Sequence, residues 1–162
     1  RSSFFRFVKP KNEDFPAKLE LASDKPAEDW IYDFTVLDAE DEKSSLSAII
    51  LDTDYYNFIC SNTTVVKGIT TIILEGLIPL KALAYSELSK IENPSEKIRI
   101  NIAKHAGDIF NLAEALSNER FELPAKIAAN LIESLNSMET PGISEERLEL
   151  LAHIREFYQL VR

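Results

Sequence analysis

The sequence predicts an α+β fold in which a β-rich first half is followed by a C-terminal helical bundle. In roughly the first seventy residues, short apolar runs that alternate with polar residues are separated by turn formers. From about Leu74 the apolar period changes from two to nearly four residues. With 162 residues, of which 45% are hydrophobic, the chain can bury one core. We therefore expect a short-stranded mixed or antiparallel sheet (residues 1–74) and a helical part (residues 75–162) packed as one unit.

Six runs have the composition and the alternation of strands. In the second of them, Leu19 and Leu21 point to one face, whereas Lys18, Glu20 and Ala22 point to the other. The runs are FFRFV (4–8), AKLELAS (17–23), DFTVL (33–37), LSAIIL (46–51), TTVVK (63–67) and TTIIL (70–74).

Helices are expected in one short and four longer segments. DTDYYNFI (52–59) reads as a short helix whose N-cap is Asp52 or Asp54. In LEGLIPLKALAYSELSKI (74–91), Pro79 fits the first turn, so the regular helix is predicted to start near Ile78.

The second long helix is predicted to end near Ser117, and either Asn93-Pro94 or Asn101 could cap it. A third helix runs from Pro124 to about Ser137, and Ser144 caps a fourth.

Composition and charge narrow the function classes. The chain holds 18 basic and 27 acidic residues, for a net charge of −9, which argues against bulk binding of duplex DNA. No apolar run is long enough to cross a membrane, so no membrane partner is expected. The single cysteine, Cys60, excludes an internal disulfide and fits a reducing, cytoplasmic compartment.

Glu20 is the first candidate for chemistry. A carboxylate on the polar face of a rigid strand is how metal-dependent phosphoryl-transfer sites present oxygen ligands to Mg²⁺. The alternative is an ordinary exposed strand face, with Lys18 and Glu20 in water.

Lys81 is the second candidate, because apolar residues surround it in LIPLKALAY. Such a lysine either extends outward over apolar surface or reaches a buried anion, for which phosphate is suitable.

Lys104 and Asp108 lie four residues apart in KHAGDIFNLAEAL (104–116), so they share one helix face. The plain interpretation is an intrahelical ion pair at the surface. Within the same segment, His105 is expected to face solvent, and Gly107 indicates close packing.

These segments, in this order, resemble the AbiEii/AbiGii-type nucleotidyltransferases, the toxin-side proteins of abortive-infection and toxin–antitoxin systems. The likeness covers about residues 3–117, from FFRF and LELAS through SSLSAIILDTDYYNFI to the two helices. It is most specific in LIPLKALAYSEL and KHAGDIFNLAEAL, which are similar to that family's "LI-x-LK-x-x-A" and "K-x-x-x-D-I-x-x-L" patterns.

The resemblance implies a nucleotidyltransferase fold in which carboxylates hold Mg²⁺ against a nucleoside triphosphate. Glu20 would be a catalytic and metal-binding carboxylate, with Lys81, Lys104 and Asp108 binding the nucleotide in the same cleft. The implied partners are the triphosphate, an RNA acceptor and a cognate antitoxin protein.

One departure from the family pattern bears on activity. The family begins with a glycine-rich turn and a paired-aspartate strand, which would lie before Arg1, so residues 1–162 alone are expected not to transfer nucleotides. Two function classes therefore stand: the C-terminal portion of a nucleotidyltransferase, or a non-catalytic binding module that retains the fold.

Overall fold

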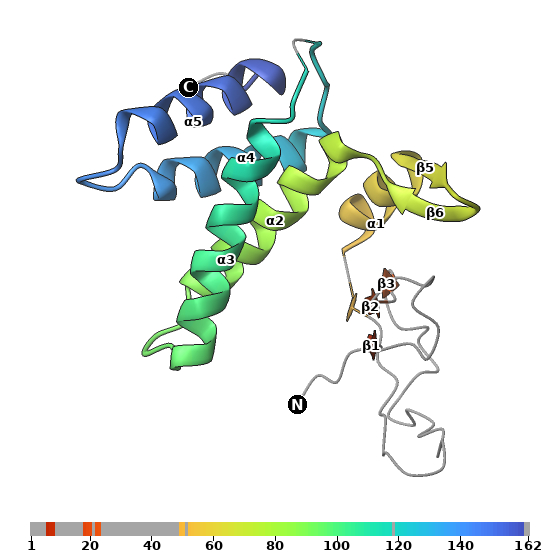
Figure 1. Ribbon diagram of the computed structural model, residues 1–162, viewed down its shortest axis with the longest axis horizontal. Coiled ribbons are helices and arrows are strands. Elements are labelled where there is room, and N and C mark those ends of the chain that lie inside the picture. The colour runs from red at the N-terminus through yellow and green to blue at the C-terminus, as the bar shows by residue number, and fades with distance from the viewer. Residues whose placement is uncertain are drawn as a thin grey trace. The chain divides into compact units, whose positions relative to one another are not determined.

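The computed structural model describes residues 6–8, 18–20, 22–23, 49–50, 52–117 and 119–160 (Figure 1). The chain divides into two compact units, Arg1–Asn57 and Phe58–Arg162, and each is described by itself. The boundary between the units, at residues 57 and 58, comes earlier than the predicted boundary between the β-rich and helical parts at residue 74. The reason is that β5 (Thr63–Val66) and β6 (Ile69–Ile72) belong to the same unit as the long helices.

Among its described residues, the first unit has two pairs of short strands. β1 (Arg6–Val8) and β2 (Lys18–Glu20) are antiparallel, and Arg6 stands opposite Glu20 in the register. β3 (Ala22–Ser23) and β4 (Ile49–Ile50) are parallel. The predictions at 4–8, 17–23 and 46–51 therefore hold at their described residues, whereas the predicted strand at 33–37 lies outside the described residues.

A short helix, α1 (Thr53–Ser61), begins in the first unit and ends in the second. Asp52 is its N-cap, because its Oδ1 accepts hydrogen bonds from the backbone N–H groups of Asp54 (3.0 Å) and Tyr55 (3.2 Å). The helix predicted for this segment is confirmed, and the capping role of Asp52 with it.

The second unit opens with a β-hairpin of β5 (Thr63–Val66) and β6 (Ile69–Ile72), which pair antiparallel. Only Lys67 and Gly68 connect them, with φ of 51° and 80°. Positive φ at both positions is the type I′ turn that matches the twist of a two-residue hairpin. The two predicted strands are thus confirmed.

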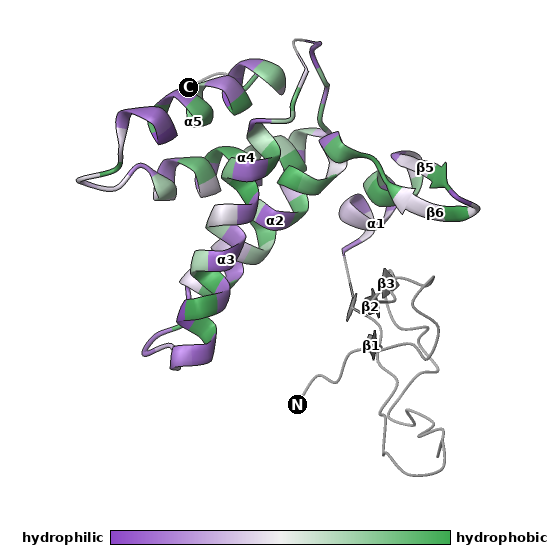
Figure 2. Ribbon diagram, viewed as in Figure 1, coloured by the Kyte–Doolittle hydropathy of each residue, from purple (hydrophilic) through white to green (hydrophobic). Residues whose placement is uncertain are grey.

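Four longer helices form the rest of this unit: α2 (Leu74–Ser89), α3 (Glu96–Ala113), α4 (Ala125–Met138) and α5 (Glu145–Phe157). α2 packs against both α3 and α4, and α3 also contacts α5. Figure 2 shows polar and apolar bands alternating along α3 and α5, as in amphipathic helices that cover a shared core. The described residues thus confirm an α+β chain that is mostly helical, with strand pairs of both orientations.

Two predicted helix starts were wrong. α2 begins at Leu74 rather than near Ile78, so Pro79 lies inside the helix and not in its first turn. α3 is capped by Ser95, whose hydroxyl accepts from the Ile98 N–H, and not by Asn93-Pro94 or Asn101. By contrast, Ser144 caps α5 as predicted.

The core of the second unit joins all four long helices, and it is mainly aliphatic. A small-residue contact brings α2 and α4 together, since the buried Ser134 hydroxyl lies 3.1 Å from the Ala82 carbonyl oxygen. At the end of α5, Phe157 and Tyr158 pack with Phe121 in an aromatic cluster. The fully buried aliphatic side chains of the four helices are Ile78, Ile109, Ile127, Leu131, Leu135, Leu151 and Ile154.

Tyr158 compensates for the proline inside α2. Pro79 has no N–H, so the Glu75 carbonyl loses its donor from the next helical turn. The Tyr158 hydroxyl donates to that carbonyl at 2.5 Å, and burial raises the pKa of Tyr158 above its ordinary value of 10.0. The interior proline is therefore accommodated by a side chain that lies 83 residues beyond Glu75 in the sequence.

Candidate functional site

The candidate site lies between α2 and α3, where two charged side chains meet. The Lys81 ammonium donates a hydrogen bond to Asp108 Oδ2 at 2.7 Å, and the two side chains are 31% and 28% exposed. Of the two alternatives for Lys81, extension over apolar surface or contact with an anion, the structure shows contact with an anion. The anion is the carboxylate of Asp108 on the neighbouring helix. The pair remains open enough to solvent for a ligand to approach it.

The partner of Asp108 differs from the one that the helix spacing predicted. The direct bond comes from Lys81 across the helix interface, while Lys104, on the same helix as Asp108, acts on the carboxylate at longer range. His105, expected to face solvent, is half-buried, and it too attracts the Asp108 charge. The periodicity of α3 identifies Lys104 as a neighbour of Asp108. The packing of α2 against α3 decides that Lys81, and not Lys104, makes the direct hydrogen bond.

Electrostatics at the pair favour the ionised carboxylate. Burial alone raises the pKa of Asp108, but the hydrogen bond and charge of Lys81, with the charges of Lys104 and His105, lower it by more. The net pKa lies below the ordinary value of 3.8. Two lysines around a single acid give this corner a local excess of positive charge, in a protein whose net charge is −9.

Gly107 does not mark a close helix contact, contrary to the prediction. A Cβ built on Gly107 meets nothing within 4 Å among the described residues. The tightly packed glycine is Gly76 in α2, where a Cβ would lie 2.6 Å from Ile72 Cδ1 and 2.7 Å from Ile72 Cγ1. Gly76 therefore lets β6 lie directly against the start of α2.

Glu20 lies on β2, the strand that the alternation predicted. It belongs to the first unit, whereas Lys81, Lys104 and Asp108 belong to the second. A cleft shared by Glu20 and Lys81 stays a prediction.

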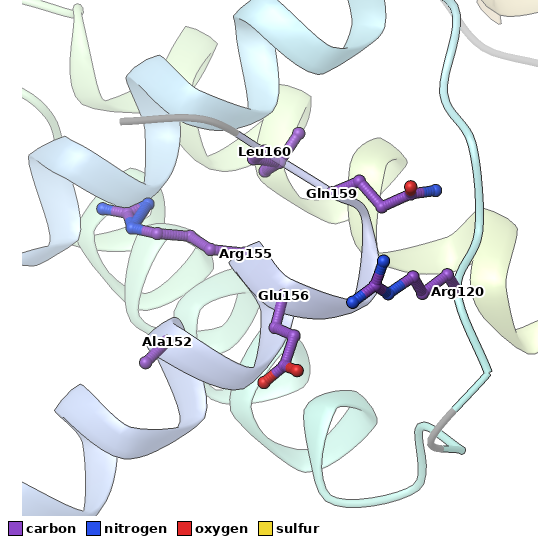
Figure 3. A pocket seen from close by; sticks show the side chains of 6 residues that line it. All are labelled: Arg120, Ala152, Arg155, Glu156, Gln159 and Leu160. Atoms are coloured by element: carbon purple, nitrogen blue, oxygen red, sulfur yellow. The ribbon is translucent and has the colours of Figure 1, made fainter.

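A separate cavity of about 440 Å³ lies at the end of α5, lined by Arg120, Ala152, Arg155, Glu156, Gln159 and Leu160. The buried Arg155 uses its Nη2 to bond Asn136 (3.0 Å) and Glu139 (2.6 Å), which ties α5 to the end of α4. Figure 3 shows the Arg155 guanidinium extending away from Arg120, so the two cations do not converge on one point. This cavity is therefore a weaker candidate than the Lys81–Asp108 pair.

Among the residues that the structure describes, no three His, Cys, Asp or Glu side chains come close enough together to hold a metal ion. Those residues therefore do not by themselves build a two-magnesium centre, which requires several carboxylate oxygens. No described helix is both long and apolar enough to cross a bilayer.

Comparisons with protein-family models, with curated proteins and with solved structures find no match to this chain. The candidate site therefore depends on the chemistry of its own side chains.

Sequence reasoning did not find Arg155 or Tyr158 as polar links between helices. Tyr158 is buried at the end of α5. The one sequence feature that indicates a need for the Tyr158 hydrogen bond is Pro79, because a proline removes a backbone N–H from α2. Finding the partner that replaces the N–H requires the packing of α5 against α2.

Proposed function

We propose that the α2–α3 corner binds the phosphates of a nucleoside triphosphate, as the nucleotide-binding part of a nucleotidyltransferase of the abortive-infection type. The observation that carries the proposal is the 2.7 Å pair of Lys81 and Asp108, with Lys104 and His105 acting on the same carboxylate. A local excess of positive charge, open to solvent, suits a polyanion.

Each charged residue has a separate part in this proposal. Lys81 and Lys104 contact phosphate oxygens, since lysine acts as a point charge toward phosphate. Asp108 lines the site as the partner of the Lys81 ammonium, so a bound phosphate would compete with its carboxylate for that lysine. Glu20 would supply a metal-binding carboxylate from its strand, and Mg²⁺ would arrive with the triphosphate. An RNA acceptor and a cognate antitoxin complete the proposed partners.

Calorimetric titration of the whole chain with tripolyphosphate and with ATP tests the proposal. Measurements at low ionic strength are preferable, because salt screens exposed charges. The Lys81→Gln substitution should weaken binding of both ligands about tenfold, whereas Asp108→Asn should strengthen tripolyphosphate binding several-fold by removing one repelling charge. Lys126→Gln on α4 is the matched control for the loss of one exposed lysine, and it should change neither affinity.

The proposal is contradicted if the wild-type chain binds neither ligand, or if Lys126→Gln weakens binding as much as Lys81→Gln. Equal losses would indicate only a general dependence on net charge. Circular dichroism of each variant checks that the helices are retained.

The second candidate is a non-catalytic interaction module, and the β5–β6 hairpin favours it. Val65, Val66 and Ile69 on this hairpin are 66%, 52% and 41% exposed. β-branched residues exposed on a two-stranded hairpin are typical of a surface that pairs with another chain. Failure to bind any triphosphate, together with partner binding that Val65→Lys abolishes, would favour this function.

A further inference from the structure

Tyr85 lies one helical turn from Lys81, on the same face of α2. Residues four apart on a helix have Cβ atoms about 5–6 Å apart, so the tyrosine ring and the lysine stem are neighbours. Lys104 and Asp108 are related in the same way on α3. The candidate site therefore draws two neighbouring residues from each of two helices.

The direction of the two helices decides which residues face each other. α2 and α3 are joined by the short connection of residues 90–95 and run side by side as a helical hairpin (Figure 1). Their chains run in opposite directions, so one turn forward from Lys81 on α2 corresponds to one turn back from Asp108 on α3. Since Lys81 contacts Asp108, Tyr85 stands at the level of Lys104.

Tyr85 is half-buried, and no other ring of the described residues packs against it. By contrast, the rings of Phe121, Phe157 and Tyr158 pack against one another. Among the described residues the Tyr85 hydroxyl also makes no hydrogen bond. A partly exposed ring between two lysines is well suited to a flat ligand that also carries negative charge.

We propose that Tyr85 is the platform on which the base of the bound nucleotide stacks, with its phosphates on Lys81 and Lys104. This inference rests on the proposed function and adds to it the recognition of the base. Stacking needs only the face of a base, so all four nucleoside triphosphates should bind. Purines should bind more tightly than pyrimidines, because a larger ring system covers more of the tyrosine.

The test compares Tyr85→Leu, which removes the ring but keeps apolar bulk, with Tyr85→Phe, which keeps the ring. Both are titrated with ATP and with tripolyphosphate, which carries the phosphates without a base. Tyr85→Leu should weaken ATP binding about tenfold and leave tripolyphosphate binding unchanged. Tyr85→Phe should bind both ligands like the wild type, which separates stacking from any role of the hydroxyl.

The outcomes distinguish this inference from the proposed function. If the wild-type chain binds tripolyphosphate as tightly as ATP, or if Tyr85→Leu leaves ATP binding unchanged, the inference is overturned and the phosphate site stands. If Tyr85→Leu weakens the binding of ATP and of tripolyphosphate equally, Tyr85 only supports the helix packing, and the inference is again overturned. A wild-type chain that binds neither ligand overturns the proposed function and this inference together.

Discussion

The Lys81–Asp108 pair joins α2 and α3 through side chains that are 31% and 28% exposed. A pair at this depth differs from a surface pair, because partial burial strengthens the attraction while water still reaches both groups. Its partners on α3 are all basic, so the carboxylate is surrounded by positive charge. The pair therefore contributes to stability and also sets the charge of the site.

The stability that Asp108 contributes should depend on pH. Its pKa is lowered in the folded chain, chiefly because Lys81 outweighs the effect of burial, so the folded state binds the proton less well than the unfolded state. The contribution is then complete above the ordinary pKa of 3.8 and is lost as the pH falls below that value. We expect Asp108→Asn to be less stable than the wild type by about 1 kcal/mol at pH 7.

Urea unfolding of both proteins between pH 7 and pH 3 measures this difference. The difference should shrink as the pH falls toward 3, because the unfolded wild-type chain takes up a proton on this carboxylate more readily than the folded chain does. A difference that stays constant over this range would show that Asp108 contributes through packing and not through its charge.

At this scale the sequence could identify which residues matter but not how they pair. The apolar surroundings of Lys81 predicted that its ammonium must find an anion or water, and it finds Asp108. The spacing of Lys104 and Asp108 predicted an intrahelical pair, but the direct bond comes from another helix. Pattern within one element cannot show what a neighbouring element supplies.

Among the secondary-structure elements, α2 depends on α5 for the hydrogen bond that Pro79 removes. Replacing Tyr158 by Phe leaves the Glu75 carbonyl without this donor, which should cost about 1–3 kcal/mol of unfolding free energy. In a Pro79→Ala background the restored N–H can serve the same carbonyl, so the cost of Tyr158→Phe should fall by about 1 kcal/mol.

Chemical denaturation of the four proteins in this cycle at pH 7 gives the coupling energy. Additive effects of the two substitutions would contradict the compensation. The raised pKa of Tyr158 adds a check, because the folded state keeps the phenol proton while the unfolded state loses it above pH 10. The advantage of the wild type over Tyr158→Phe should therefore decline as the pH rises beyond 10.

The two helical glycines should respond oppositely to alanine. Gly107→Ala should stabilise the protein by about 0.5–1 kcal/mol, because alanine favours the helix and its Cβ has open space. Gly76→Ala should destabilise it by about 1 kcal/mol, because the new Cβ must displace Ile72.

Thermal unfolding of the two variants decides between these effects. Stabilisation by both substitutions would mean that helix propensity alone governs the two sites. Destabilisation by Gly107→Ala would instead support the close packing that the sequence suggested at that position.

The elements were more predictable than their ends. α4 and α5 begin where Pro124 and Ser144 predicted, because proline favours the start of a helix and the Ser144 hydroxyl accepts from the Arg147 N–H. α2 begins earlier than predicted, since packing and Tyr158 tolerate a proline that local rules place in a first turn. The hairpin turn at Lys67 and Gly68 was not predicted, because Lys67 was assigned to the strand at 63–67; the pairing of β5 with β6 defines the turn.

For the whole chain, we expect nucleotide binding without nucleotide transfer. Glu20 is the one strand carboxylate that the sequence pattern assigns to metal binding. Transfer assisted by two metals needs several carboxylates. Incubation of residues 1–162 with labelled triphosphates, Mg²⁺ and RNA should give no labelled product. Labelling that requires Mg²⁺ and is abolished by Glu20→Ala would contradict this expectation.

The chain as a whole repels polyanions, because its net charge is −9. The proposed site therefore depends on the local charge of Lys81 and Lys104. Which side chains meet a ligand is therefore the central question for the molecule. Quantitative lysine acetylation of the whole chain, followed by mass spectrometry with and without ATP, answers it residue by residue. We predict that ATP slows the modification of Lys81 and Lys104 several-fold and leaves Lys126 unchanged. Equal rates at Lys81 and Lys104 with and without saturating ATP would contradict the account.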